Sequence, residues 1–483
     1  MAKSKTSSYI LTLPLNTEKY QEDELNKRFE KCRKIYNSCI TELFKRYNHM
    51  IESKDYQKNV KSKSKDRNKI FNELNNKYGL SEYSLHRFVV NMYNYFNIDS
   101  KTAQALATRA FNAFQKYMFH QAKRVNYIKY NELYSIEGKT NAQGIKYRDG
   151  YIRWNKLSIP TIIRNNDIYA QTAIQNRVKY CRIVKKEIKG KIKFYVQLIM
   201  EGVPPTKVNK DGELKGQIGQ GNVGIDMGTR TIAYSSKYDV KLLELAPNVN
   251  NINREIKLIQ RKMDRSRKSM NPNKYNENGT IKQGNKDKWI YSNHYMKLKS
   301  QKKELYRKES EIRKQDHYKM INELLILGDK FYVETMQFKG LQRRSNKTEK
   351  NNNGKFKKKK RFGKSLANKA PSMFLTMLDN KLKWNGNKLY KIDTFKCRAS
   401  QYNHFTGEYH KKELKDRWNE DIKIQRDMYS AFLIMNVKGN LKEIDRDKCI
   451  ETYDNFKILH DKEINRLKEI KNNGIKLISS MGI

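Results

Sequence analysis

Three short apolar segments that lie far apart in the chain each carry one acidic residue. Residues 223–233 predict a strand, a tight turn and a second strand, with Asp226 near the turn. Residues 330–335 are apolar and β-prone up to Glu334, and residues 425–436 begin an apolar helix with Asp427 in its first turn. Small residues follow Asp427, so that this helix start can approach a neighbouring sheet closely. We therefore predict that the three carboxylates meet at one end of a sheet.

Carboxylates from two strands and a helix start can together bind the metal ions of two-metal phosphodiester hydrolysis. Two Mg²⁺ ions, ~3.5–4 Å apart, clamp the attacking and leaving oxygens and require hard oxygen ligands rather than His or Cys. The sequence predicts Asp226, Glu334 and Asp427 as catalytic residues and as ligands of two Mg²⁺ ions, for which Mn²⁺ can substitute. Taken alone, Glu334 also fits a plain surface residue that ends a strand.

The glycines around Asp226 do not by themselves identify a nuclease. Sugar kinases, actins and the Hsp70 class use a similar hairpin to hold ATP phosphates, with a glycine such as Gly228 letting the ligand approach the backbone. Actin-like ATPases also use a later Gly-Gly turn against adenosine, whereas this chain has no Gly-Gly pair. The actin-like ATPase is therefore a distant third hypothesis.

The charge of the chain points to nucleic acid. The sequence holds 101 Lys and Arg against 51 Asp and Glu, which gives a formal net charge of +50 over 483 residues. Such an imbalance makes the compact state repel itself unless a polyanion neutralises it, and it attracts nucleic acid. A coding bias toward Lys would raise Glu as well, so the two-to-one excess of basic residues supports a nucleic-acid partner.

Cysteine use and hydropathy predict where the protein works. Five cysteines at irregular spacing, with no C-x-x-C pair, make a disulfide framework improbable and fit a reducing compartment. There is no apolar run of 18 residues and no apolar segment after Met1. We therefore expect a cytoplasmic protein without a membrane partner.

Hydrophobic periodicity divides the chain into two halves. A strand at residues 9–15 leads into a long helical stretch, a second helix is expected at about 100–123, and residues 180–200 alternate as a hairpin. A polar linker at 210–222 precedes a new domain. A heptad stripe formed by Tyr291, Leu298, Leu305 and Ile312 predicts a long helix docked along a domain, in preference to a coiled-coil dimer.

A low-complexity basic segment, residues 343–361, is the predicted contact for nucleic-acid phosphates. Phe356 and Phe362 are available for stacking on bases, and a solvated loop is the alternative interpretation. The predicted phosphate-binding residues are Arg343, Arg344, Lys355, Lys357, Lys358, Lys359, Lys360 and Arg361.

The three acidic motifs resemble the split RuvC nuclease domain of the TnpB and Cas12f family, an RNase H-like fold. The resemblance lies in Gly224-Ile225-Asp226-Met227-Gly228, in Val333-Glu334 followed by Phe338-Lys339-Gly340-Leu341, and in Arg426-Asp427 followed by Ala431. Residues 362–374 and 394–417 resemble segments that TnpB proteins carry after the second acid. The motifs cover roughly the last 260 residues, and the first half is similar in layout only.

This resemblance implies an α+β, multidomain, two-lobed protein. A helical recognition region and a β-barrel-like wedge region would precede a split RNase H-like (RuvC) α/β nuclease domain. The implied parts are 1–20 and 131–215 for the wedge region and linker, 21–130 for the recognition region, 216–396 and 422–483 for the nuclease domain, and 397–421 for a degenerate zinc-ribbon-like insertion that binds target nucleic acid.

The implied function is that of an RNA-guided DNA endonuclease with a guide RNA and a target DNA as partners. Pairing with the guide would read the sequence, while the protein reads a short flanking motif. The resemblance leaves open whether the chain is a CRISPR effector or a transposon-encoded nuclease, and whether a homodimer forms on one guide RNA. The rival hypothesis is a non-cleaving RNA-guided or RNA-binding protein.

One departure from the family concerns zinc. Relatives usually place a four-ligand zinc ribbon between the second and third acids, whereas this interval offers only Cys397, His404 and His410. Three ligands do not close a tetrahedral structural site, so we expect no zinc and a ribbon held by aromatic residues.

Asp445-Arg446-Asp447 resembles the third acidic motif, but no small residues on an apolar helix follow it. We expect it on a solvated helix surface.

Overall fold

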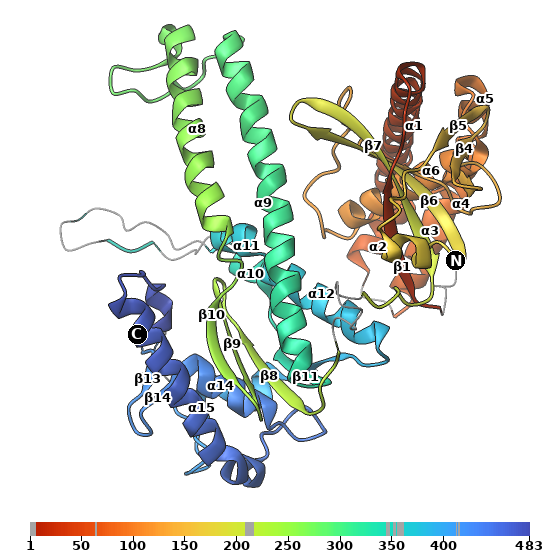
Figure 1. Cartoon of the computed structure of the whole chain (residues 1–483). Coiled ribbons are helices and arrows are strands. Elements are labelled where there is room, and N and C mark those ends of the chain that lie inside the picture. Colours follow the sequence, from red (N-terminus) through yellow and green to blue (C-terminus); the bar gives the residue numbers. More distant parts are fainter. Residues whose placement is uncertain are drawn as a thin grey trace. The chain divides into compact units, whose positions relative to one another are not determined.

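The computed structural model of the chain has a mixed α/β architecture with several sheets (Figure 1). It describes residues 6–62, 65–207, 217–343, 348–350, 354, 362–411, 413 and 416–483. The chain divides into two compact units, Met1–Pro205 and Thr206–Ile483. In the described residues, no helix is both long enough and apolar enough to cross a membrane.

Unit 1 packs long helices against an antiparallel sheet. The sheet has the order β1-β7-β6-β2, and its centre is the predicted hairpin of β6 (Val178–Ile188) and β7 (Lys191–Glu201). The expected first strand is β1 (Ser8–Pro14), which pairs with β7. The long helix α1 (Lys19–Glu52) follows and contacts α6 (Ser100–Met118). Phe29 of α1 and Phe114 of α6 are fully buried, which places the core between these layers.

The predicted second helix ends five residues earlier than the expected position 123. The chain leaves α6 because His120 adopts a left-handed conformation with φ of 54°. The backbone N–H groups of Gln121 and Ala122 then both donate to the carbonyl of Lys116, which satisfies an acceptor at the helix end. The hydrophobic pattern that predicted a helix to position 123 does not show where the backbone ends that helix.

The remaining elements of unit 1 are short. They are α2 (Lys54–Lys61), α3 (Arg67–Lys77), α4 (Glu82–Phe88), α5 (Val90–Phe96), α7 (Ile168–Ala173) and β2 (Ser135–Glu137), with a separate small sheet formed by β3 (Lys146–Arg148), β4 (Tyr151–Trp154) and β5 (Leu157–Pro160).

Unit 2 is built on a five-stranded sheet of order β10-β9-β8-β11-β12. The strands β8 (Asn222–Met227), β9 (Thr231–Ser236) and β10 (Val240–Glu244) follow one another in the sheet, and β9 pairs antiparallel with both β8 and β10. On the other side of β8, the strands β11 (Lys330–Glu334) and β12 (Leu389–Ile392) run parallel to it. The sheet is therefore antiparallel on one side of β8 and parallel on the other.

Helices cover both faces of this sheet. One core joins Ile225 and Val333 with Leu324 of α9 (Asn293–Ile326) and Leu378 of α12 (Pro371–Trp384). The other core contains most of α14 (Arg426–Met435) and the buried side of α15 (Arg446–Asn472). Figure 1 shows α14 and α15 in blue beside the yellow-green strands. Because strand residues alternate between these cores, the face that each side chain occupies follows from its position.

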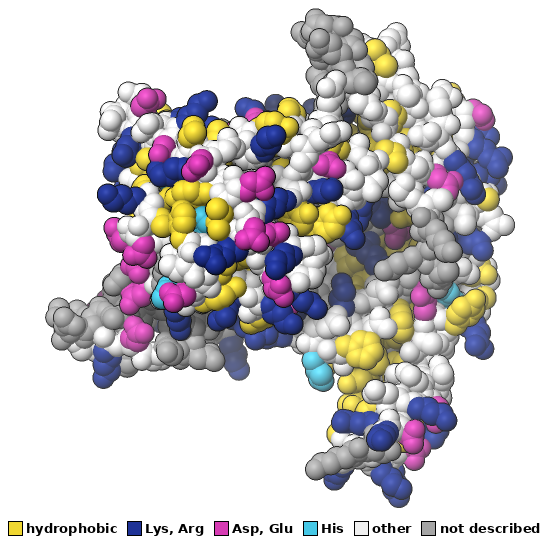
Figure 2. Space-filling model, turned by 90° about the horizontal axis from the view of Figure 1, so that it is seen from below, with side chains coloured by type: hydrophobic (Ala, Val, Ile, Leu, Met, Phe, Trp, Pro, Cys, Tyr) yellow, Lys and Arg dark blue, Asp and Glu magenta, His cyan; other side chains and the backbone are white. Residues whose placement is uncertain are grey.

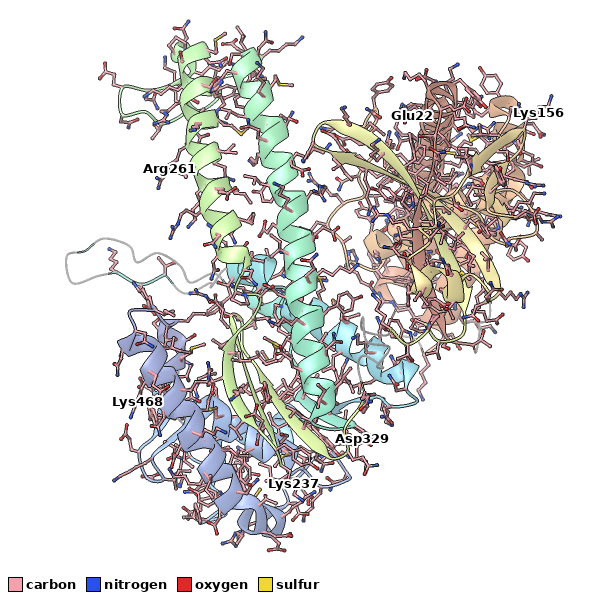
Figure 3. All side chains as sticks on the ribbon, in the orientation of Figure 1. Glu22, Lys156, Lys237, Arg261, Asp329 and Lys468 are labelled. Carbon is pink, nitrogen blue, oxygen red and sulfur yellow. The ribbon has the colours of Figure 1, made fainter. Side chains whose placement is uncertain are left out.

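The predicted long helix is α9, and it pairs with α8 (Val249–Met270) as an antiparallel helical hairpin (Figure 1). Leu298 and Leu305 of the heptad stripe are buried, and α8 supplies buried Ile256 and Met263. Tyr291 precedes the helix. Arg261 lies on the side of α8 that faces away from α9 (Figure 3). The buried part of the stripe, Leu298 and Leu305, is therefore covered by a helix of the same chain.

Short elements complete unit 2. They are the 3-10 turns Pro272–Lys274, Ala399–Gln401 and Ser479–Met481, α10 (Phe338–Leu341), α11 (Gly363–Lys369), α13 (Thr394–Cys397), and the two-stranded pair β13 (Trp418–Asn419) and β14 (Ile424–Gln425).

Candidate active site

Asp226 and Glu334 lie side by side at the carboxyl ends of two neighbouring parallel strands. Val333 of β11 pairs with Ile225 of β8, so Glu334 is next to Asp226 in the register. Ile225 and Val333 point into the core formed with α9 and α12. By alternation, Asp226 and Glu334 both face the opposite side of the sheet, which α14 covers.

Helix α14 contacts β8 directly at Gly224. A Cβ atom on Gly224 would overlap the carbonyl oxygen of Ala431 and the backbone nitrogen of Met435, and it would lie 2.8 Å from the Cα of Met435. Gly224 precedes Asp226 by two positions and so shares its face. The glycine is therefore required because the backbones of β8 and of the second half of α14 touch, which holds this helix against the sheet.

The start of α14 is fixed by several hydrogen bonds. The side chain of Gln425 accepts a hydrogen bond from the backbone N–H of Met428 (2.9 Å) and donates to the carbonyl of Met481 (3.2 Å). Its backbone N–H donates to Nε2 of buried His460 (3.1 Å). These contacts hold the turn that carries Asp427.

The charges of Asp427 and Glu334 act on the buried carboxylate of Asp226. Burial raises the pKa of Asp226 well above its ordinary value, and the negative charges of Asp427 and Glu334 raise it further. Arg426 and Arg417 offset part of this increase. Burial also raises the pKa of Glu334. The structure thus brings Asp226, Glu334 and Asp427 together.

Two arginines hold Asp427. Its carboxylate lies 3.8 Å from Nη1 of Arg417 and 3.5 Å from Nε of Arg426, and its side chain is 15% exposed. Arg417 ends the segment 394–417 that resembles TnpB proteins, but the sequence predicts no role for it in the site. The signal available in the sequence was the adjacent Arg426, which the motif contains but to which no role was assigned.

The donor set suits a hard divalent cation. Three carboxylates share a desolvated position, and a metal ion there would remove the mutual repulsion that raises the pKa of Asp226. In the described part of the chain, no three His, Cys, Asp or Glu side chains already stand in a metal-coordinating arrangement. Here Asp427 faces arginines, so its side chain would have to turn to act as a ligand.

The hairpin turn after β8 leaves little room for a side chain at Gly228. A Cβ on Gly228 would lie 2.8 Å from Oγ1 of Thr231, and the backbone N–H of Gly228 donates to the carbonyl of Thr231 (2.9 Å). The close contact comes from the hairpin turn itself. Asp226 is therefore placed by a tight turn between β8 and β9.

A cavity of about 640 Å³ lies beside the strand end that carries Glu334, lined in part by Thr335. The Thr335 N–H donates to Oγ1 of Thr394 (3.0 Å) at the start of α13, and Asp393 caps that turn. Phe395 in the same turn lines this cavity and is 88% exposed. An exposed aromatic ring thus lies in the turn that is hydrogen-bonded to the residue after Glu334.

The three potential zinc ligands each have another partner. His404 is buried with Nδ1 2.6 Å from the hydroxyl of Tyr429, and His410 lies 3.1 Å from Glu408. Burial, with the negative charges of Asp393, Glu334 and Glu443, raises the pKa of Cys397 to about 11. A protonated thiol is a poor zinc ligand. The absence of zinc stays a prediction.

Asp445-Arg446-Asp447, which resembles the third acidic motif, lies at the start of helix α15. Asp445 is the N-cap, and its side chain accepts a hydrogen bond from the backbone N–H of Lys448 (3.2 Å). Asp447 lies in the first turn and is exposed. This arrangement is the solvated helix position expected from the sequence.

Most of the predicted phosphate-binding segment lies outside the described residues. Arg343, just after α10, is exposed. The other predicted contacts, Arg344, Lys355, Lys357, Lys358, Lys359, Lys360 and Arg361, are outside the described ranges. Figure 2 shows Lys and Arg side chains spread across the face that it presents, with acidic side chains among them.

The chain is similar to known proteins in its three-dimensional structure. No protein-family model and no curated protein sequence matches the chain. The chain is similar to the cryo-EM structure of a Cas12f1-sgRNA-target DNA complex, with a TM-score of 0.42 and 11% identity, over 88% of this chain and 98% of that chain. It is similar to a CRISPR-Cas12f ternary complex with a TM-score of 0.27 and 12% identity, over 86% and 82%. The Cas12f family that the motifs resemble is also the family of these two structures.

Proposed function

We propose that the chain is an RNA-guided DNA endonuclease whose cleavage site consists of Asp226, Glu334 and Asp427. The observation that carries this proposal is their convergence: two carboxylates at the ends of adjacent parallel strands and a third in the first turn of α14. Carboxylates gathered away from solvent cost free energy in a protein that only binds nucleic acid, since phosphates would repel them. A cation-dependent reaction gives them a purpose.

The topology of unit 2 supports an RNase H-like nuclease domain. Three antiparallel strands followed by two parallel ones, with helices on both faces, place the acids on the central strand and its parallel neighbour. In this proposal the RuvC-like domain is split, with residues 216–396 and 422–483 contributing to it and residues 397–421 forming a ribbon-like insertion. Residues 1–215 would form the wedge and recognition regions.

The side chains of the site have distinct proposed roles. Asp226, Glu334 and Asp427 would hold two Mg²⁺ ions, which supply an activated water and neutralise the leaving oxygen when bound. Arg417 and Arg426 position Asp427 and place positive charge where a phosphodiester would lie. The Asp427 side chain is only 15% exposed, and partial burial strengthens its electrostatic contacts with the arginines.

The proposed partners are a guide RNA and a target DNA. The net charge of +50 supports a polyanionic partner. The Cas12f1 structure named above contains an sgRNA and a target DNA. The rival, a non-cleaving RNA-guided or RNA-binding protein, shares the charge but gives no role to the three acids.

Metal removal tests the proposed reaction. The protein, purified with the RNA that accompanies it and given a DNA target complementary to that RNA, should cut the target with Mg²⁺ or Mn²⁺ and not with excess EDTA. Gel analysis of end-labelled DNA measures the product. Target binding without cleavage at any divalent-ion concentration would favour the non-cleaving rival.

Salt dependence tests the basic segment. Each lost phosphate contact should flatten a plot of log affinity against log salt by roughly 0.7–0.9. Replacing Lys357, Lys358, Lys359 and Lys360 together by Ala should therefore reduce the slope by about one or more, measured by fluorescence anisotropy with the guided target. An unchanged slope would contradict phosphate binding by this segment.

A further inference from the structure

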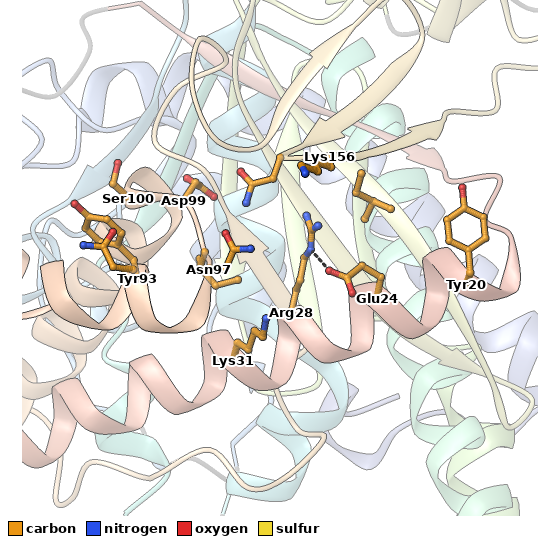
Figure 4. Close-up of a pocket in the computed structure, with 13 residues that line it drawn as sticks. Tyr20, Glu24, Arg28, Lys31, Tyr93, Asn97, Asp99, Ser100 and Lys156 are labelled. Atoms are coloured by element: carbon orange, nitrogen blue, oxygen red, sulfur yellow. Dashed lines mark hydrogen bonds and ion pairs between the residues drawn. The ribbon is translucent and has the colours of Figure 1, made fainter.

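Unit 1 contains an open cavity of about 780 Å³ that the proposed cleavage site does not use, which we call the α1 cavity (Figure 4). Its walls come from the first turns of α1, the junction of α5 and α6, and the turn between β4 and β5. The volume lies in the ~300–1,000 Å³ range of ligand pockets. All of its lining residues belong to unit 1.

The floor of the α1 cavity is a buried polar network. Arg28 donates from Nε to Glu24 (2.8 Å) and from Nη1 to the carbonyl of Trp154 (2.6 Å). The indole N–H of Trp154 donates to Asp99 (2.7 Å), which also caps α6 through the N–H of Thr102 (2.8 Å). This network ties the three walls together, so the shape of the cavity is fixed before any ligand arrives.

The network engages the acidic groups and leaves positive charge available. Glu24 is paired with Arg28, and Asp99 accepts two hydrogen bonds. The Arg28 side chain is only 10% exposed, and among the described residues its Nη2 has no hydrogen-bond acceptor. Figure 4 shows the guanidinium of Arg28 reaching from α1 into the cavity. A buried guanidinium with a free donor is suited to an anionic oxygen.

Two lysines add to this charge. Lys31 of α1 and Lys156 of the β4–β5 turn line the cavity, and neither forms a hydrogen bond or ion pair with the described residues. Counting Glu24 and Asp99 against Arg28, Lys31 and Lys156, the lining carries one net positive charge. A ligand with a single negative charge matches it.

The remaining lining offers ring faces and amides. Tyr20 and Tyr93 stand at opposite ends of the cavity in Figure 4. The side-chain amides of Asn94, Asn97 and Asn155 also line it, and they have no hydrogen-bond partner among the described residues. An amide both donates and accepts, which matches the edge of a nucleobase, and a tyrosine ring stacks on its face.

We propose that the α1 cavity binds one unstacked nucleotide of a single-stranded nucleic acid. Arg28, Lys31 and Lys156 contact its phosphate, a tyrosine ring stacks on its base, and the asparagine amides contact the base edge. An acidic peptide would use the positive charge but would leave both rings and all three amides without a purpose. The inference depends on nucleic acid as a partner and not on the cleavage chemistry.

Photocrosslinking of the full chain locates the nucleotide. The protein is freed of co-purified RNA and mixed with tetranucleotides, one DNA and one RNA, that each carry a 5-iodouracil. Moderate salt weakens contacts made only through phosphate. Illumination and peptide mass spectrometry should place the crosslink on Tyr20 or Tyr93. The DNA and RNA arms show which nucleic acid supplies the nucleotide.

Two variants measure the contributions of the lysine pair and of one tyrosine ring. Lys31→Ala with Lys156→Ala should weaken binding of the tetranucleotide about tenfold or more and flatten its salt dependence by up to about 0.7–0.9, the slope of one phosphate contact. Tyr93→Ala should weaken it about 5- to 100-fold. The same Tyr93→Ala change should leave binding of an abasic tetranucleotide unaltered, because that probe has no base to stack. Neither lysine has an internal partner, so the double variant should fold normally.

Matched controls come from the same unit. Tyr95, on the same helix as Tyr93, is 83% exposed and does not line the cavity, so Tyr95→Ala should bind as the parent does. Lys45→Ala with Lys191→Ala, at two exposed lysines away from the cavity, should change affinity less than the cavity pair does. The proposal is overturned if the crosslink falls outside the cavity, if the two lysine pairs behave alike, or if an acidic hexapeptide displaces the probe as well as an unlabelled tetranucleotide does. None of these results depends on whether the protein cleaves DNA.

Discussion

Asp226→Ala, Glu334→Ala and Asp427→Ala should each reduce guided DNA cleavage by roughly three orders of magnitude or more. The three carboxylates converge at one position, so removing one ligand disables both the activation of water and the neutralisation of the leaving oxygen. A double variant should lose little more than a single one, since members of one catalytic unit are strongly non-additive. Single-turnover rates with saturating guide and target measure the effect.

Binding should survive these substitutions. In the proposed function other parts of the chain hold guide and target, so affinity for the target should change by less than about tenfold, or roughly 1.4 kcal/mol. Asp447→Ala is the matched control, because Asp447 is an exposed residue in the first turn of α15. Wild-type cleavage by Asp427→Ala together with loss in Asp447→Ala would show that the third acid is wrongly assigned. Normal cleavage by all three alanine variants would reject the nuclease proposal.

Gly224→Ala should destabilise unit 2 strongly, and far more than Gly439→Ala does. The new Cβ would overlap backbone atoms of Ala431 and Met435, which cannot rotate away as a side chain can. Overpacking of this kind costs up to about 3 kcal/mol, and ~2–4 °C is lost per kcal/mol in a domain of 150–250 residues. We expect the thermal midpoint of unit 2 to fall by roughly 6–12 °C in differential scanning calorimetry.

The same substitution should also reduce cleavage in the protein that remains folded, because α14 must move away from β8 and carries Asp427 with it. Gly439→Ala is the matched control, since a Cβ on Gly439 meets no atom within 4 Å and the residue does not require a left-handed conformation. A thermal midpoint for Gly224→Ala that equals that of Gly439→Ala would show that the close packing of helix and strand is wrongly described.

The sequence predicted the strands and helices that carry the three acids because each has a strong local signal. Asp226 lies before a tight turn, Glu334 ends an apolar run, and Asp427 begins an apolar helix with small residues at its contact face. Alternation along β8 and β11 then determines which side chains share a face. The convergence of the acids follows from these patterns together with one further fact, that β11 lies parallel to β8.

Other features depend on contacts between distant residues and leave little trace in the sequence. Arg417 approaches Asp427 only because β13 and β14 fold back on each other, and no periodicity marks that position. The heptad stripe of α9 packs against α8, and the heptad pattern alone does not identify that partner. The end of α6 at Met118 depends on the left-handed conformation of His120, a residue type that carries only a weak signal for capping.

The order of the strands has a consequence for the timing of synthesis. β8 is made first, its parallel partner β11 follows about a hundred residues later, and the helix that covers both comes roughly another hundred residues later. At ~5–20 residues per second, the ribosome takes about 10–40 s to proceed from Asp226 to Asp427. A nascent or truncated chain that stops before α14 has two of the three acids, no helix over Gly224 and an uncovered sheet face. In the proposed function, a nuclease built in this way is inactive until α14 has been synthesised and has packed on the sheet.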